Sequence, residues 1–315
     1  MLIAAMIIGS IVLICLISFM INKILSRGEL DNIKPYGKLV EVNEKRIHLY
    51  SRGKGLETIV LLPGLNIPLP CADFRPLMDD LAEKYTVVCV EYFGYGFSDE
   101  TDVPRTNENY VEEMRAALAA AGFLPPYILM PYSASGIYSE YYAAKYPEEV
   151  AALILIDTTS SAEAETAMPP RFIFNIVKLQ QAIGLARFLN PLVLPKAVGL
   201  STQNGYTQQE IKDFIKFANH VYNNTLIDQN VRFPANVLEV MSMEFSASVP
   251  VLAIKADIYS KGKWSQYLNN HMKKLGKHAK CDVIAESNHA SIYHDRGQRK
   301  KVCEAIGQFL ESRDE

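Results

Sequence analysis

The chain has 315 residues, 49% of them hydrophobic and 21% charged, a composition that argues against intrinsic disorder and fibrous repeats. Its 32 Lys and Arg residues nearly balance 35 Asp and Glu residues, and the resulting net charge of -3 without a long basic run disfavours nucleic-acid binding. The five cysteines are scattered and odd in number, which suggests neither a disulfide framework nor a zinc cluster and is typical of buried thiols in a reducing compartment.

The first segment, residues 2–21, carries no charge and is long enough, at about 1.5 Å per residue, to span a ~30 Å hydrocarbon core. A cleaved signal peptide would have a basic residue before this run and small residues at a cleavage site after it, and neither is present. We interpret the segment as an uncleaved single-pass membrane anchor, with a buried core helix as the alternative. The basic residues that follow it predict that the rest of the chain lies on the cytoplasmic side.

After a polar linker, apolar runs of strand length alternate with helical or polar segments. A hairpin is predicted at residues 39–43 and 46–51. Further strands are predicted at residues 58–62, 86–90, 127–130, 151–156, 249–254 and 282–285. This alternation indicates an α/β protein with a mainly parallel sheet, and helical apolar stripes within 111–121 and 302–310 are expected to cover it.

The alternation stops between about residues 160 and 246, where helical stretches such as 171–189 and 208–222 follow one another without a strand. We interpret this part as a helical cap over the sheet. Its many apolar residues are expected to pack on the main domain, with some lining a pocket or touching a membrane. The predicted organisation is an anchor at 1–22, a linker at 23–37, a core at 38–159 and 247–315, and the cap at 160–246.

The most informative motif lies at residues 127–138, where a buried strand leads into Ser133 and then into a helical pattern. A nucleophile on such a sharp turn needs small neighbours, which Ala134, Ser135 and Gly136 supply. The usual pattern is G-x-S-x-G, whereas Pro131 and Ser135 replace both glycines here. Taken alone, the motif is also compatible with an ordinary helix N-cap serine.

Several separated motifs between about residues 38 and 310 resemble the α/β-hydrolase superfamily. They are Leu-Leu-Pro-Gly-Leu at 61–65, Glu-Tyr-Phe-Gly-Tyr-Gly-Phe-Ser-Asp at 91–99, and the helix and strand of 142–157 that follow the elbow. The resemblance implies the α/β-hydrolase fold, a mostly parallel central sheet flanked by helices with a helical cap insertion. It also implies that Ser133 is a nucleophile. The Ser at position 133 argues against the haloalkane dehalogenases and epoxide hydrolases, which resemble this fold but use an Asp as the nucleophile.

By the same resemblance, His289 is the general base, because it follows the last predicted strand and precedes the final helix. His294 is the fallback, and the other four histidines are interpreted as surface or packing residues. Asp257, after the strand at 249–254, is the preferred triad acid and gives the chain order Ser133, Asp257, His289. Asp157, at the end of the preceding strand, is the alternative acid.

The backbone N–H groups of Leu65 and Ala134 are expected to form an oxyanion hole, with Pro63 in place of the family's His. Asn66 is either an added donor or a turn residue, and Tyr132 either contacts substrate or fills space beside the elbow. No metal-binding, phosphate-loop or dinucleotide motif is found, so neither a metal nor a cofactor is predicted.

The sequence thus predicts a membrane-anchored serine hydrolase that cleaves an ester or thioester through an acyl-enzyme on Ser133, with His289 as general base. The expected partners are a small-molecule substrate, amphiphilic in character, and the membrane. A peptidase, acyltransferase or perhydrolase on the same residues is an alternative. So is a non-catalytic ligand-binding protein on the hydrolase scaffold, because the glycines of the elbow are replaced.

Overall fold

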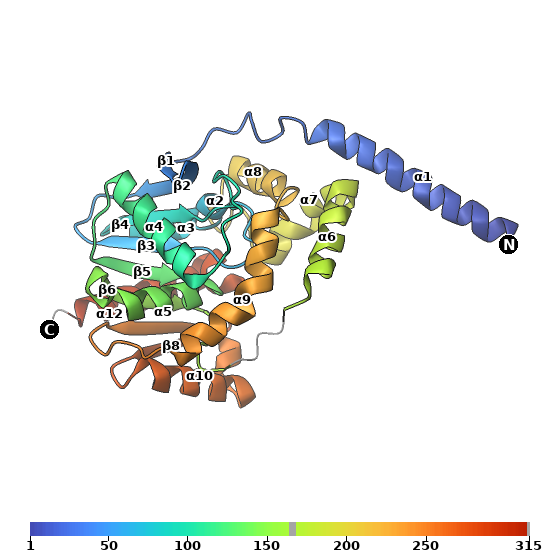
Figure 1. The fold of residues 1–315 in the computed structure, drawn as a ribbon. Helices are drawn as coiled ribbons and strands as arrows, with labels where there is room; N and C mark the ends of the chain where they lie inside the picture. Colours follow the sequence, from blue (N-terminus) through green and yellow to red (C-terminus); the bar gives the residue numbers. More distant parts are fainter. Residues whose placement is uncertain (164–167, 314–315) are drawn as a thin grey trace.

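An eight-stranded sheet forms the centre of the computed structural model, which describes residues 1–163 and 168–313. The strands follow the spatial order β1-β2-β4-β3-β5-β6-β7-β8 (Figure 1). Strand β2 pairs antiparallel with β1 and β4, and the remaining neighbours pair in parallel. Their bounds are β1 Lys38–Val42, β2 Lys45–Arg52, β3 Thr58–Leu62, β4 Thr86–Glu91, β5 Tyr127–Pro131, β6 Val150–Ile156, β7 Val251–Ala256 and β8 Lys280–Ile284. The predicted α/β class and mostly parallel sheet are confirmed.

Helices cover both faces of the sheet, because successive residues of each central strand point to opposite sides. In β3, Val60 and Leu62 pack toward one face, against α4 and α5, while Ile59 and Leu61 pack toward the other, against α3 and α12. The helices of the two layers are α2 Pro70–Asp73, α3 Arg75–Leu81, α4 Asn107–Ala121, α5 Ser135–Lys145, α10 Gly262–Leu275, α11 Ser291–His294 and α12 Arg296–Glu311.

In the described part of the segment between β6 and β7, four helices cover the edge of the sheet at which the parallel strands end. They are α6 Arg171–Ile183, α7 Leu185–Val198, α8 Gln208–Ala218 and α9 Asn224–Ser242, and we call them the cap helices. The stretch 171–189, predicted as one helical run, is divided at Gly184, whose φ of 83° ends α6 in the left-handed region. Helix α7 then continues at an angle of 98° to α6.

Helix α1, Leu2–Leu25, projects from the molecule on the side of α6 and α7 (Figure 1). Its mean hydropathy is 2.9 and its apolar side chains are exposed along most of its length, so it is long and apolar enough to cross a membrane. A signal sequence passes the same test of length and composition.

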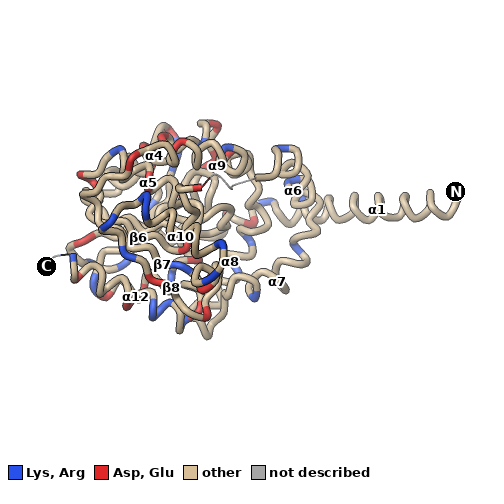
Figure 2. The backbone as a smooth tube through the Cα atoms, turned by 90° about the horizontal axis from the view of Figure 1, so that it is seen from below, with Lys and Arg blue, Asp and Glu red and all other residues tan. Residues whose placement is uncertain are grey.

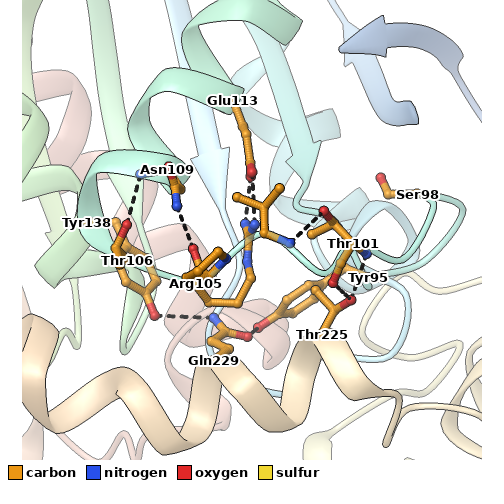
Figure 3. Close-up of polar contacts among 12 residues, drawn as sticks. Tyr95, Ser98, Thr101, Arg105, Thr106, Asn109, Glu113, Tyr138, Thr225 and Gln229 are labelled. Carbon is orange, nitrogen blue, oxygen red and sulfur yellow. Dashed lines mark hydrogen bonds and ion pairs between the residues drawn. The ribbon is translucent and has the colours of Figure 1, made fainter. Parts of the chain in front are cut away.

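Helix α9 is fastened to the core by polar contacts that cross from the cap helices to the loop before α4 (Figure 3). Thr225 accepts the Thr101 backbone N–H at 2.8 Å and donates to the Thr101 carbonyl at 2.9 Å. The Gln229 side-chain carbonyl accepts a hydrogen bond from the Tyr95 hydroxyl, and its amide N–H donates one to the Tyr138 hydroxyl. These contacts fix the cap helices relative to the carboxyl ends of the strands.

Arg105 is the fully buried cation of this loop. Its guanidinium donates two hydrogen bonds to Glu113, at 2.9 and 2.6 Å, and lies 4.1 Å from the centre of the Tyr110 ring. Its backbone N–H donates to Asp228 of α9, and its carbonyl accepts from Asn236 of the same helix. The buried pair therefore shapes the segment that holds α9.

We predict that Arg105→Met lowers the free energy of unfolding by about 3–5 kcal/mol, because the Glu113 carboxylate is left buried without its partner. The double variant Arg105→Met/Glu113→Leu should regain most of this loss, since no unpaired charge remains. Urea unfolding of the detergent-solubilised chain measures both. Equal stability of the single variant and the parent would contradict the prediction.

Candidate active site

Ser133 lies on a sharp turn between strand β5 and helix α5. Its φ of 55° is in the left-handed region, which costs a non-glycine residue energy and is held here by the surrounding backbone. The Ser133 N–H donates to the Ile156 carbonyl at 3.1 Å, and its carbonyl accepts from Gly136 and Thr159. The turn is thus bonded to the neighbouring strand β6 on both sides of the hydroxyl.

Two glycines are required where other segments approach this turn. A Cβ on Gly64 would lie 2.9 Å from the Cβ of Ser133, and a Cβ on Gly136 would lie 2.5 Å from that of Thr158. Both distances are shorter than real Cβ contacts. The close approach is therefore supplied by Gly64 and Gly136 and not by the two positions of the usual elbow pattern.

Ser135, which replaces the second glycine of that pattern, has a structural use for its hydroxyl. The side chain is fully buried, donates to the Pro63 carbonyl and lies 3.1 Å from the Tyr92 hydroxyl. It therefore joins the elbow to the loop that follows β3. Sequence reasoning treated Ser135 as a small neighbour and missed this contact.

His289 meets Ser133 from the loop between β8 and α11. Its Nε2 lies 3.1 Å from Ser133 Oγ, and the imidazole remains about half exposed, at 53%. The ring stacks on Tyr132 with centroids 4.7 Å apart, and the Tyr132 hydroxyl donates to the His289 carbonyl at 2.8 Å. Tyr132 is 5% exposed, so it positions the His289 loop from beneath.

Asp157, the alternative acid, is the carboxylate that contacts His289. Its Oδ2 lies 2.5 Å from His289 Nδ1, and its Oδ1 accepts the Ala256 backbone N–H at 2.9 Å. The φ of 44° at Asp157 turns the chain at the end of β6 and aims the side chain across the sheet edge. Asp157, and not the preferred Asp257, therefore lies within hydrogen-bond reach of His289.

Asp257 lies elsewhere because strand β7 runs two residues further than predicted, to Ala256. The chain then enters a short 3₁₀ turn at Asp257–Ser260, and the Asp257 N–H donates to the Ser287 carbonyl at 3.2 Å. Within the described ranges, no hydrogen bond joins Asp257 to His289. Asp157 contacts His289 directly instead, and its second carboxylate oxygen accepts the Ala256 N–H.

A buried cation lies beside this carboxylate. Lys255, in the middle of an otherwise apolar strand, is 1% exposed and donates to the Thr158 carbonyl at 2.5 Å. Burial raises the pKa of Asp157, but the hydrogen bond from His289 and the charges of His289 and Lys255 outweigh it and lower the pKa below its usual range. Asp157 is therefore a carboxylate at neutral pH. A lone Lys in the strand sequence Val-Leu-Ala-Ile-Lys-Ala was the signal that sequence reasoning overlooked.

The loop after β3 brings a second set of groups to Ser133. Leu65 is on this loop and Ala134 follows Ser133, and among residues 1–163 and 168–313 neither backbone N–H has an acceptor. Asn66, with a φ of 59°, is a turn residue whose side-chain amide pairs reciprocally with that of Asn230 on α9, at 2.8 and 3.1 Å. Within the described ranges, these two N–H groups are therefore available as donors near Ser133.

A cavity of about 420 Å³ extends from this loop beneath the cap helices. Its wall is mainly apolar and includes, from the loop, Leu65, Asn66 and Ile67, and from the cap helices Val177, Leu194 and Phe214. It offers room for a small ligand next to the Leu65 N–H.

Four of the other histidines, His48, His220, His271 and His294, have hydrogen-bond partners of their own. The fallback base, His294, is buried and hydrogen-bonded to Asp73 at 2.9 Å, so it does not reach Ser133. His48 lies within 4.8 Å of ligand atoms of Cys71 and Glu91, a grouping compatible in composition with a metal. Both of its ring nitrogens are already hydrogen-bonded, to Glu91 and to the Gly37 N–H, so this cluster does not fit a metal ion.

Comparison with known proteins agrees with this topology. Residues 57–198 match the family described as alpha/beta hydrolase fold. The uncharacterized protein YbdG of Bacillus subtilis is 28% identical over 284 residues, which cover 89% of this chain and 83% of that protein. The 2-(acetamidomethylene)succinate hydrolase of Mesorhizobium japonicum is 29% identical over 51% of this chain and 59% of its own length. An epoxide hydrolase from Bacillus megaterium has a TM-score of 0.66 at 17% identity, over 87% of this chain and all of that one, a likeness of fold.

The two acids can be separated by a pair of matched substitutions. We predict that Asp157→Asn slows the reaction of Ser133 with a fluorophosphonate by about 10⁴-fold, because the amide no longer holds the imidazole in the required tautomer. Asp257→Asn is the control and should react at the parent rate. A slow Asp257 variant beside a normal Asp157 variant would restore the original assignment.

Lys255 has a test in the titration of Asp157. Because its charge lowers the pKa of Asp157, Lys255→Met should raise that pKa, which a carbon NMR titration of the Asp157 carboxyl measures. Lys263→Met, at an exposed position on α10, is the matched control and should leave the Asp157 pKa in place. An unchanged Asp157 pKa in the Lys255 variant would show that Lys255 acts only in packing.

Proposed function

We propose that the chain is a member of the α/β-hydrolase superfamily and a serine hydrolase that cleaves a carboxylic ester or thioester of a small molecule. The observation that carries this proposal is the single row of contacts from Ser133 through His289 to Asp157, with distances of 3.1 and 2.5 Å. Nucleophile, base and orienting acid lie within hydrogen-bond reach of one another, which is the arrangement that activates a serine hydroxyl.

In the proposed reaction, Ser133 Oγ attacks the acyl carbon while its proton passes to His289 Nε2. The former carbonyl oxygen becomes an oxyanion, which in this proposal accepts hydrogen bonds from the Leu65 and Ala134 N–H groups. Collapse of this intermediate breaks the bond to the alcohol or thiol, which leaves with the proton from His289. Water then attacks the acyl-enzyme and gives its proton to His289, which passes it to Ser133 Oγ as the bond to the acyl group breaks and the acid is released.

The elbow residue is the reason to prefer acyl transfer over epoxide opening. Solved neighbours include epoxide hydrolases, but their identity to this chain is below 20%, and the likeness extends to the fold alone. Within the superfamily, epoxide hydrolases resemble this fold but use an Asp nucleophile. Ser133 instead favours an acyl-enzyme.

We propose further that α1 anchors the enzyme in a membrane, with the remaining chain on the cytoplasmic side. In support, α1 has 24 residues, and its basic residues, beginning with Lys23, come after the apolar run. The apolar side chains along α1 are not buried by the protein, which is what a lipid-facing helix requires.

The serine assignment has a direct test. Detergent-solubilised parent protein should be labelled by a fluorophosphonate probe, and Ser133→Ala and His289→Ala should not be, because the first lacks the nucleophile and the second lacks its base. Ser246→Ala, in the exposed loop before β7, is the matched serine control and should label as the parent does. Absence of labelling in folded parent protein would favour a non-catalytic ligand-binding protein.

The leaving group is resolved by a substrate panel. Aryl esters and thioesters should be hydrolysed, and Ser133→Ala should reduce this turnover by about 10⁶-fold, to the level left by binding alone. Aminoacyl amides presented at the same concentration should be poorer substrates. Faster release of the amine would move the assignment to a peptidase on the same residues.

A further inference from the structure

Helices α6 and α7 turn apolar side chains outward, the reverse of the usual arrangement of a surface helix. Eight of these side chains are between 46% and 69% exposed: Phe172, Ile176 and Leu179 on α6, and Leu185, Phe188, Leu189, Leu192 and Val193 on α7. Their spacings of three and four residues place them along one side of each helix. We call these eight residues the outer face.

The opposite sides of the same helices line the cavity beside the active site. Val177 and Gln181 of α6 and Ala186, Asn190 and Leu194 of α7 contribute to its wall. Each helix thus already packs one side toward the protein. The outer face is a second, separate apolar surface of the same helices. A contiguous exposed apolar surface of this kind marks a binding partner or a membrane.

Helix α1 is bonded to the corner between α6 and α7. Ser18 Oγ donates to the Ile183 carbonyl at 2.7 Å, and the Asn22 amide donates to the Gln181 and Ala182 carbonyls at 3.1 and 2.9 Å. These are carbonyls of the last turn of α6, which an α-helix leaves without partners. The corner is therefore fixed to the final two turns of α1.

The position of these bonds sets the depth of the corner. The uncharged run of residues 2–21 spans a hydrocarbon core, so Ser18 and Asn22 lie at its boundary when α1 crosses a bilayer. In both views α1 leaves the molecule on the side of α6 and α7 (Figures 1 and 2). Helices lying in the interface bury their apolar sides by about 5–10 Å at this depth.

The charges of this segment favour a lipid surface with negative headgroups. Residues 171–199 contain no Asp or Glu. Of their four basic side chains, Arg171 pairs with Asp228 and Arg187 with Glu29, whereas among the described residues Lys178 and Lys196 have no ion pair. Lys23, Arg27 and Lys178 line a pocket of about 420 Å³ where α1 meets α6. Basic residues next to an apolar surface at the end of a membrane span attract anionic lipids.

We propose that the outer face of α6 and α7 is embedded in the leaflet from which α1 emerges, and that its ligand is an anionic phospholipid bilayer. This inference rests on the anchor proposed for α1 but adds a second, separate membrane contact. The cap helices would then separate lipid on one side from the cavity on the other. A second copy of the chain is a poorer occupant, because the two basic segments would repel each other.

The full chain in lipid nanodiscs tests the proposal by fluorescence quenching. An environment-sensitive dye is attached at Leu189→Cys, at Ile11→Cys in α1, or at Leu124→Cys in the connection before β5, with Cys15, Cys281 and Cys303 replaced by Ala. Leu124 is 74% exposed, so it matches the outer face in exposure while lying on the core. The nanodiscs contain phosphatidylglycerol and phosphatidylcholine with a quencher near the headgroup or near the chain end.

The dye at position 189 should be quenched most strongly by the shallow quencher, the dye at 11 by the deep one, and the dye at 124 by neither. Quenching at 11 without quenching at 189 would overturn the inference and leave the anchor intact. No quenching at either position would remove the anchor as well. A blue-shifted but unquenched dye at 189, in discs that hold two copies, would assign the outer face to a protein contact and also overturn the inference.

A second measurement uses turnover. Leu192→Glu should reduce hydrolysis of an ester dissolved in the bilayer several-fold and leave hydrolysis of a water-soluble aryl ester unchanged, and Leu124→Glu should change neither. If the Leu192 variant hydrolysed both substrates at the rates of the parent protein, the result would count against the inference. Loss of the soluble reaction in the parent would instead contradict the proposed hydrolase.

Discussion

The left-handed backbone of Ser133 is the constraint on which the rest of the site depends. It lifts the hydroxyl off the end of β5, and the Ala134 N–H has no backbone partner in the part of the chain that the structure describes. It also lets Gly64 approach so closely that a side chain there would strike Ser133. The cost of the conformation is met by hydrogen bonds to β6 and the start of α5, so the parallel sheet and the reactive turn stabilise each other.

Much of the fold follows from the sequence, because apolar runs of strand length and helical stripes are local patterns that tertiary packing preserves here. The positions of Ser133 and His289 could be named because each directly follows a predicted strand. The acid could not be named, because hydrophobic periodicity does not define the exact end of a strand. Strand β7 ends two residues later than predicted, at Ala256, and this shift takes Asp257 away from His289. Only the contact between neighbouring strand ends reveals that Asp157 is the partner of His289.

Other contributions depend on long-range contacts that no motif describes. The hydroxyl of Ser135 reaches a carbonyl more than seventy residues earlier in the chain, and Tyr132 supports the His289 loop across the sheet edge. A Lys is usually found at the protein surface, and nothing local in the sequence indicates that Lys255 is buried. The pairing of β6 with β7 buries it near Asp157. The departures from the usual elbow glycines are thus accommodated by neighbours distant in sequence.

The joint between α1 and the cap helices also has a mechanical consequence. Arg187 donates from all three of its nitrogens to Asn22, Ser26 and Glu29, and His220 contacts the same Glu29. Several hydrogen bonds from one side chain hold α1 at a fixed angle to α7, whereas a flexible linker would let the two helices rotate independently. With α1 in a bilayer, as proposed, a tilt imposed on it by a thinner or thicker membrane would rotate the α6–α7 corner with it, and would couple the adjoining cavity to membrane thickness.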